Sequence, residues 1–208
     1  MTAPRISPAL AKLSRPRLAR VHPRERLFLR LDECLEHTAV WVQGVPGAGK
    51  TTLIASYLDS RKLPVLWYRT DSGDSDPVAC CHSLQIAARR TAARAGSELP
   101  LLAPAQTADL EPSLRRFFAA FHASIGGPHI LVVDDAQEAL PSPGFCQLLR
   151  AAISEAPDHI RLIIASRTRP PGDFARLLAN EDLVVLGADE LLLTEDESIA
   201  VQQLDPSG

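Results

Sequence analysis

The chain has 208 residues, of which 46% are apolar and 23% carry a charge, and its formal net charge is −3. These values are typical of a globular protein with one ample α/β domain and a short additional segment. No apolar stretch approaches the roughly 18 residues of a membrane span, and the N-terminus lacks the apolar core of a signal peptide. We therefore expect a cytoplasmic protein, neither inserted in a membrane nor exported.

The N-terminal region is basic. Eight Lys and Arg residues lie within the first thirty positions, where Glu25 is the one acid. Such a cluster can contact nucleic acid, or its side chains can pair with acids elsewhere in the domain. Because no aromatic residues are interleaved for base stacking, we favour pairing and expect no direct DNA binding. Residues 1–21, which are also rich in proline, are expected to form an extended basic lead-in.

Further along the chain, short apolar runs alternate with amphipathic segments. Strands are expected at residues 38–43, 63–69, 129–135, 161–167 and 182–186. Helices are expected at residues 24–35, 51–58, 77–93, 110–124, 144–155 and 174–179, with a loop at 95–107. This regular alternation predicts an α/β fold with a five-stranded, mainly parallel sheet and helices on both faces. In such a sheet, ligands bind at the carboxyl ends of the strands.

Neither the cysteines nor the acidic segment 71–76 has the spacing of a metal site. The four cysteines lack a C-x-x-C pair, so we expect reduced thiols in the core, and the six histidines form no ligand pattern, so we expect no zinc. Within residues 71–76, Gly73 stands where a calcium ligand would be required, and no glutamate closes the loop. Asp76 is better placed as the N-cap of a helix that begins at Pro77.

The most specific motif lies between the first strand of the expected sheet and the helix that follows it. Residues 44–51 read Gly-Val-Pro-Gly-Ala-Gly-Lys-Thr and fit the phosphate-binding pattern G-x-x-x-x-G-K-[ST] (Walker A) at every fixed position. The glycines let backbone N–H groups surround a phosphate, Lys50 supplies a charge for the β- and γ-phosphates, and the Thr51 hydroxyl can ligate Mg²⁺. The alternative is a purely structural glycine turn. The predicted phosphate-binding residues are Gly44, Val45, Pro46, Gly47, Ala48, Gly49, Lys50, Thr51 and Thr52.

Two adjacent acids, Asp134 and Asp135, end the expected strand 129–135. An acid after four apolar residues is the partner of the phosphate loop (Walker B), because it holds Mg²⁺. We assign Asp134, with Thr51, to the metal. Asp135 is assigned to orienting or deprotonating the attacking water, with Glu138 as the alternative base. Asp135 could instead serve as the N-cap of a helix.

The expected strand 161–167 ends in Ser166 and Arg167. An arginine at this edge of the sheet can contact the γ-phosphate of a nucleotide and sense whether that phosphate is present. We therefore count Arg167 with Lys50 and Asp135 as the candidate catalytic residues. The alternative is an exposed arginine without such a role.

Taken together, these motifs resemble the nucleotide-binding domain of STAND signal-transduction ATPases, in particular bacterial regulators similar to the maltose regulon activator. The resemblance extends from about residue 10 to residue 205. It is carried by residues 12–16, 24–27, 44–51, 67–71, 74–77, 131–135, 164–167, 170–171, 175–180, 188–191 and 193–198.

The resemblance implies a P-loop NTPase of the ASCE type, with the strand 161–167 between the loop strand and the Asp134 strand. It also implies an ATP/ADP switch that hydrolyses slowly, uses Mg²⁺, can form nucleotide-dependent homo-oligomers, and has its N-terminal segment beside the adenine. Family members usually continue into sensor and effector domains. We therefore expect residues 22–190 to form the NTPase domain and 191–208 the start of a following helical module, truncated before the histidine with which that module commonly holds ADP phosphates.

The leading hypothesis is thus an ATP-binding, slowly hydrolysing switch domain from a bacterial signalling or transcriptional regulator. A second hypothesis is a non-catalytic module that holds nucleotide and works by oligomerising. A third, a small-molecule phosphotransferase, is less favoured because the sequence offers no clear lid or acceptor-binding motif. No motif identifies the inducer or the regulated process.

Overall fold

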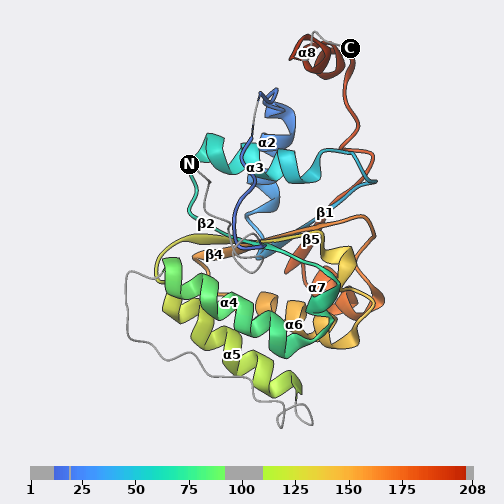
Figure 1. Cartoon of the computed structure of the whole chain (residues 1–208). Helices are drawn as coiled ribbons and strands as arrows, with labels where there is room; N and C mark the ends of the chain where they lie inside the picture. Colours follow the sequence, from blue (N-terminus) through green and yellow to red (C-terminus); the bar gives the residue numbers. More distant parts are fainter. Residues whose placement is uncertain (1–11, 19, 92–109, 205–208) are drawn as a thin grey trace.

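The computed structural model describes residues 12–18, 20–91 and 110–204, and these form a three-layer α/β structure around a five-stranded sheet (Figure 1). The strand order is β2-β3-β4-β1-β5, and all four pairings are parallel. The strands are β1 (Ala39–Gln43), β2 (Val65–Arg69), β3 (His129–Asp134), β4 (Ile160–Ser166) and β5 (Leu183–Leu186). The predicted fold class is confirmed, and β4 lies between β1 and β3 as the resemblance implied.

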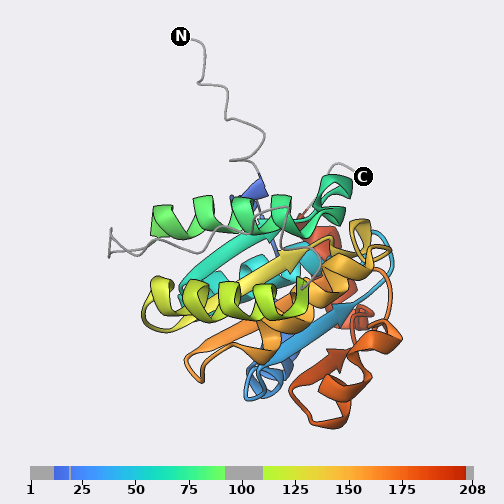
Figure 2. The ribbon, with the colours of Figure 1, turned by 90° about the horizontal axis from the view of Figure 1, so that it is seen from below.

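Helices cover both faces of the sheet, as expected. Figure 1 shows α2 and α3 on one face and α4, α5, α6 and α7 on the other. Figure 2, which views the sheet from the second side, shows α4 and α5 lying side by side across it. The α-helices are α2 (Glu25–Cys34), α3 (Lys50–Arg61), α4 (Pro77–Thr91), α5 (Leu110–Ile125), α6 (Pro143–Ser154), α7 (Ala175–Ala179) and α8 (Glu195–Leu204). Short 3-10 helices occur at η1 (Ser72–Ser75), η3 (Ala136–Glu138) and η4 (Gly172–Phe174).

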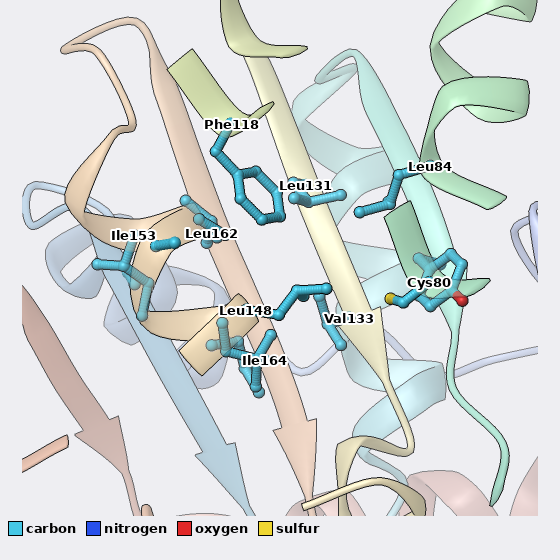
Figure 3. Close-up of a cluster of buried hydrophobic side chains, with 14 of the residues drawn as sticks. Cys80, Leu84, Phe118, Leu131, Val133, Leu148, Ile153, Leu162 and Ile164 are labelled. Atoms are coloured by element: carbon cyan, nitrogen blue, oxygen red, sulfur yellow. The ribbon is translucent and has the colours of Figure 1, made fainter. Parts of the chain in front are cut away.

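The sheet separates two hydrophobic cores, because successive side chains of a strand point to opposite faces. In β1, Val40 and Val42 pack with α2 and α3, whereas Trp41 packs with the helices of the opposite face. Figure 3 shows part of this second core, where Phe118 of α5 lies beside Leu131 of β3. Apolar side chains on both faces explain why the central strands read as continuous apolar runs.

The four cysteines are free and buried in these cores, which confirms the prediction of reduced thiols that act as small apolar residues. Burial raises the pKa of the Cys80 thiol to about 12, so the thiol stays protonated at neutral pH.

Most element boundaries were predicted to within a few residues, with informative exceptions. The strands expected to run to Asp135 and Arg167 end one residue earlier, at Asp134 and Ser166. Asp135 adopts a left-handed backbone with φ of 55°, which stops β3. The expected helix 174–179 is a 3-10 turn followed by α7. The loop expected at 95–107 lies outside the described residues.

Within the segment 71–76, Ser72–Ser75 form the 3-10 helix η1, which was not predicted from the sequence. A capping box explains it, since the Asp71 side chain accepts from the Gly73 N–H and the Asp74 carboxylate accepts from the Asp71 N–H. The prediction for Asp76 is confirmed, because its carboxylate accepts a hydrogen bond from the Val78 N–H at the start of α4.

Five of the eight basic N-terminal side chains pair with acids of the domain, as we favoured, whereas Arg5 lies outside the described residues. Lys12 contacts Asp71 and Asp74, Arg15 contacts Asp59, Arg24 and Arg26 contact Glu197, and Arg30 contacts Glu190 and Glu33. Within the described part of the chain, no helix is both long and apolar enough to cross a bilayer.

Candidate nucleotide-binding site

The predicted phosphate loop connects β1 to α3 at the carboxyl edge of the sheet. Gly47 and Gly49 adopt φ angles of 80° and 78°, which only glycine tolerates readily. The Gly44 N–H donates to the Ser166 carbonyl over 3.1 Å, so the loop is tied to the end of β4. Lys50 begins α3, whose first N–H groups and dipole favour an anion beside the loop.

The Lys50 ammonium is buried beneath this loop. Its Nζ donates to the Gly44 carbonyl over 2.6 Å and to the Val45 carbonyl over 3.1 Å. Burial lowers the pKa of Lys50, while the negative charges of Asp135 and Asp134 oppose this effect. The two carbonyls are neutral acceptors, and the oxygens of a bound anion could replace them as partners of the ammonium.

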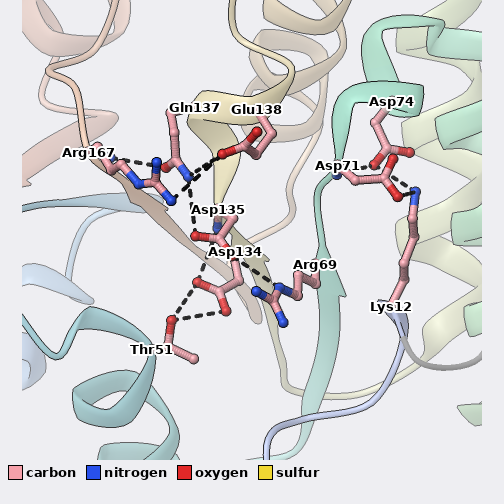
Figure 4. A network of polar contacts seen from close by, with 10 residues as sticks. All are labelled: Lys12, Thr51, Arg69, Asp71, Asp74, Asp134, Asp135, Gln137, Glu138 and Arg167. Atoms are coloured by element: carbon pink, nitrogen blue, oxygen red, sulfur yellow. Dashed lines mark hydrogen bonds and ion pairs between the residues drawn. The ribbon is translucent and has the colours of Figure 1, made fainter. Parts of the chain in front are cut away.

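The side chains of Thr51 and Asp134 meet, as the paired motifs predicted. The Thr51 hydroxyl donates to the two carboxylate oxygens of Asp134 over 3.0 and 3.1 Å (Figure 4). Burial raises the pKa of Asp134, with the Thr51 hydrogen bond opposing this rise. A buried carboxylate beside a hydroxyl is a set of hard oxygen donors, which fits Mg²⁺.

Asp135 lies at the same edge but faces a different partner. It occupies the position before η3 without making a capping hydrogen bond. Its Oδ2 accepts from Nε of Arg69 over 3.0 Å, and its Oδ1 accepts from the Gln137 amide over 3.2 Å. The carboxylate is therefore directed toward the end of β2.

Arg167 follows the last residue of β4 and is tied to the same network. Its backbone N–H donates to Oε1 of Gln137 over 3.1 Å, and its guanidinium lies 3.8 Å from the Glu138 carboxylate. The positive charge of Arg167 also acts to lower the pKa of Lys50. The structure thus gathers every predicted catalytic residue at one edge of the sheet.

Two residues of this edge, Arg69 and Gln137, were not predicted from the sequence as members of the site. The signal that identified Asp134 and Arg167, a charged residue at the end of an apolar strand, also applies to Arg69 after residues 65–68. Gln137 had no such signal, because its position depends on the turn at Asp135.

A pocket of about 800 Å³ opens on the other side of the phosphate loop. Its walls come from residues 20–24, from the loop and the start of α3, and from the C-terminal segment 188–204. Thr52, predicted among the phosphate-binding residues, lines this pocket, whereas Lys50 and Asp134 do not. The loop therefore separates a largely apolar pocket from the charged edge.

Arg24 holds the C-terminal wall of this pocket in place. Its guanidinium donates to the carbonyls of Leu191 and Leu192 and to the Glu197 carboxylate, over 3.0, 2.9 and 2.9 Å. Thr194 and Glu197 also cap the start of α8 reciprocally.

An all-parallel sheet of this order, with a phosphate loop after β1 and a metal-type acid at the end of β3, defines a P-loop NTPase. Solved structures share the fold. A STAND protein with a tetratricopeptide repeat sensor from Pyrococcus horikoshii aligns with a TM-score of 0.60 at 19% identity, over 93% of this chain and 27% of that one. A Walker-type ATPase of Pyrococcus abyssi aligns with a TM-score of 0.55 at 17% identity, over 87% of this chain and 57% of that one.

The sequence profile of the family described as Nephrocystin 3, N-terminal, matches residues 28–167, and the chain belongs to this family. The HTH-type transcriptional regulator MalT of Cronobacter sakazakii is 30% identical over 190 residues, which cover 90% of this chain and 21% of MalT. MalT of Yersinia enterocolitica is 28% identical over 190 residues, which again cover 90% of this chain and 21% of MalT. The predicted resemblance to STAND ATPases and maltose regulators is confirmed, and the chain spans about a fifth of the length of these curated relatives.

Proposed function

We propose that the chain is the ATP-binding, slowly hydrolysing switch domain of a bacterial STAND-type signalling or transcriptional regulator. The contact between Thr51 and Asp134, beside Lys50 and beneath the loop, is the observation that carries this proposal. It joins two motifs 83 positions apart, and a hydroxyl beside a carboxylate at this edge supports a site for Mg²⁺ and nucleotide phosphates. The relationship to MalT regulators supports the regulatory context and a cytoplasmic location.

The two sides of the loop suit the two halves of a nucleotide. The apolar pocket, with its walls from residues 20–24 and 188–204, has room for a nucleoside. The N–H groups of the loop and Lys50 would hold the phosphates. Mg²⁺, bound by Thr51 and Asp134, would neutralise charge on the β- and γ-phosphates.

In hydrolysis, Asp135 would orient the attacking water and accept one of its protons. The water oxygen forms a bond to the γ-phosphorus, the bond between that phosphorus and the bridging oxygen breaks, and its electron pair leaves with ADP. Lys50 and Arg167 would stabilise the charge that develops on the phosphoryl oxygens.

Loss of the γ-phosphate would remove the ligand that Lys50, Mg²⁺ and Arg167 share. We propose that this difference favours the resting state with ADP and an assembly-competent state with ATP. We further propose that residues 22–190 form the switch and that α8, within 191–208, begins the next module. Its contacts with Arg24 and Arg26 would then carry the state of the site to that module.

Calorimetric titration of the chain with Mg·ATP and with ADP tests the proposal. We expect saturable binding that Lys50→Ala weakens at least tenfold, because the buried ammonium contributes a charge that alanine lacks. Lys62→Ala, at the far end of α3, is the matched control and should bind like the wild type. Equal affinity of Lys50→Ala and wild type would refute the proposed site. Persistent ADP after purification without phosphate release would instead favour the non-catalytic oligomerisation module.

A further inference from the structure

Arg69 at the end of β2 forms an ion pair with the carboxylate proposed as the catalytic base. Its Nε lies 3.0 Å from Oδ2 of Asp135, and both side chains lie at the carboxyl edge of the sheet (Figure 4). The pairing follows from the register, in which Arg69 is the direct neighbour of Asp134 on β3. Residues 67 and 69 share a face of β2, and Trp67 packs in the core that contains α3, so Arg69 lies on the phosphate-loop side.

The backbone at Asp135 makes this ion pair possible. In a continued strand, Asp135 would point to the face opposite Asp134. Its φ of 55° breaks that alternation and turns the carboxylate toward Arg69. A left-handed conformation is uncommon for a residue other than glycine, and such conformations cluster at functional sites.

Both carboxylate oxygens of Asp135 are engaged. Oδ2 accepts from Arg69 and Oδ1 accepts from the Gln137 amide, whose own oxygen accepts from the Arg167 N–H. A base that must take a proton from water needs a free lone pair directed at that water. Each oxygen keeps a second lone pair, but the two hydrogen bonds fix the orientation of the carboxylate toward Arg69 and Gln137, so Asp135 would have to turn before a lone pair could face an attacking water.

The alternative base is held in a similar way. Glu138 faces the Arg167 guanidinium at 3.8 Å. Each carboxylate of the edge that could activate water therefore faces an arginine from a neighbouring strand end.

We propose that Arg69 is a positioning residue that restrains Asp135 and thereby keeps ATP hydrolysis slow. This inference rests on the proposed function, because it assumes that Asp135 is the base. With 65% of its side chain exposed, Arg69 can leave the carboxylate at small cost, so that the restraint is adjustable. A partner or module that draws Arg69 away would accelerate hydrolysis and shorten the ATP state.

Steady-state hydrolysis by the full chain tests this restraint. For Arg69→Ala, we expect kcat to rise about twofold to fivefold, the factor that an ion pair of this exposure can contribute, with the KM for ATP unchanged. The kcat of Arg69→Lys should lie between those of the wild type and Arg69→Ala, because lysine keeps the charge and loses the planar donor geometry. Arg115→Ala is the matched control: Arg115 pairs through Nε with Glu155, is 59% exposed and lies away from the site on α5. It should leave kcat unchanged.

If Arg69 acts by restraining Asp135, the rise in kcat of Arg69→Ala must require Asp135, whereas a general change in the site would raise kcat without it. In an Asp135→Asn background, Arg69→Ala should produce no rise in turnover. A kcat that is unchanged or lower in Arg69→Ala, or a rise that persists without Asp135, would overturn the inference. The inference would also be overturned if wild type and Arg69→Ala both bind Mg·ATP but neither hydrolyses it. In that case the binding measured by calorimetry would still support the nucleotide site. Failure of Lys50→Ala to weaken binding would refute the proposed function itself.

Discussion

The contact between Arg24 and Glu197 is predicted to fasten the start of α8 to the rest of the domain. Each side chain is only 10% exposed, and their charged atoms lie 2.9 Å apart. Glu197 also accepts from the Thr194 N–H and lies 3.4 Å from Arg26. Replacing Glu197 by Gln preserves the shape and one acceptor but removes the charge that these groups share, and it leaves the buried Arg24 guanidinium without a counter-ion.

The expected cost is about 2 kcal/mol, the size of a hydrogen bond between charged groups that is largely shielded from water. Because α8 packs at the periphery, this cost should appear as local opening. A loss of about 2 kcal/mol corresponds to a roughly 30-fold increase in the population of the open form. Hydrogen exchange measured by mass spectrometry should therefore show about 30-fold faster exchange for the amides of α8.

The effect should depend on pH. Burial acts to raise the pKa of Glu197, but the hydrogen bonds from Arg24 and Thr194 outweigh it, so the pKa lies below its ordinary value of 4.5. A carboxyl group with a lowered pKa in the folded state stabilises that state above its unfolded pKa, and this contribution disappears as the pH falls through the folded pKa. The ratio of the exchange rate in the variant to that in the wild type should thus be largest at pH 7 and fall toward one as the pH drops through the lowered pKa of Glu197.

Glu195→Gln provides the control, because Glu195 is an exposed acid in the same first turn of α8. It removes the same charge from the same helix end without touching Arg24. If both variants exchange at the same rate, the reasoning from burial is refuted, and the helix dipole accounts for the effect.

Two further changes address the chemistry and the core. Asp135→Asn should bind Mg·ATP like the wild type but lose turnover in a phosphate-release assay, because the amide cannot accept the proton of water. Undiminished turnover would assign the role of the base to Glu138 or to another residue. Phe118→Ala, in the core shown in Figure 3, should lower the free energy of unfolding in urea by about 3–5 kcal/mol, because its fully buried ring leaves a cavity. Leu192→Ala, where the side chain is 68% exposed, should change it by less than about 0.5 kcal/mol, and a similar loss for both variants would contradict the assignment of the core.

The sequence predicted what depends on local pattern. Continuous apolar strands such as residues 130–133 require burial on both faces, and that requirement specified a parallel sheet between two helical layers. The phosphate loop was recognisable because its glycines, Lys50 and Thr51 act within eight consecutive positions. Asp134 was found by the same reasoning, since a strand end in a parallel sheet falls at a known edge.

The partners of the side chains at the site could not be predicted from these motifs, because they depend on contacts between distant parts of the chain. The sequence left open whether Asp135 is a base or a helix cap, and its left-handed backbone together with the register of β2 turned its carboxylate to Arg69. The pairing of Arg24 with Glu197 joins positions 173 apart, and Arg24 itself lines the pocket beside the C-terminal segment that it contacts. Side-chain periodicity assigns a residue to a face of its own element, but the partner it meets there is set by how the elements pack, and only the tertiary structure decides that.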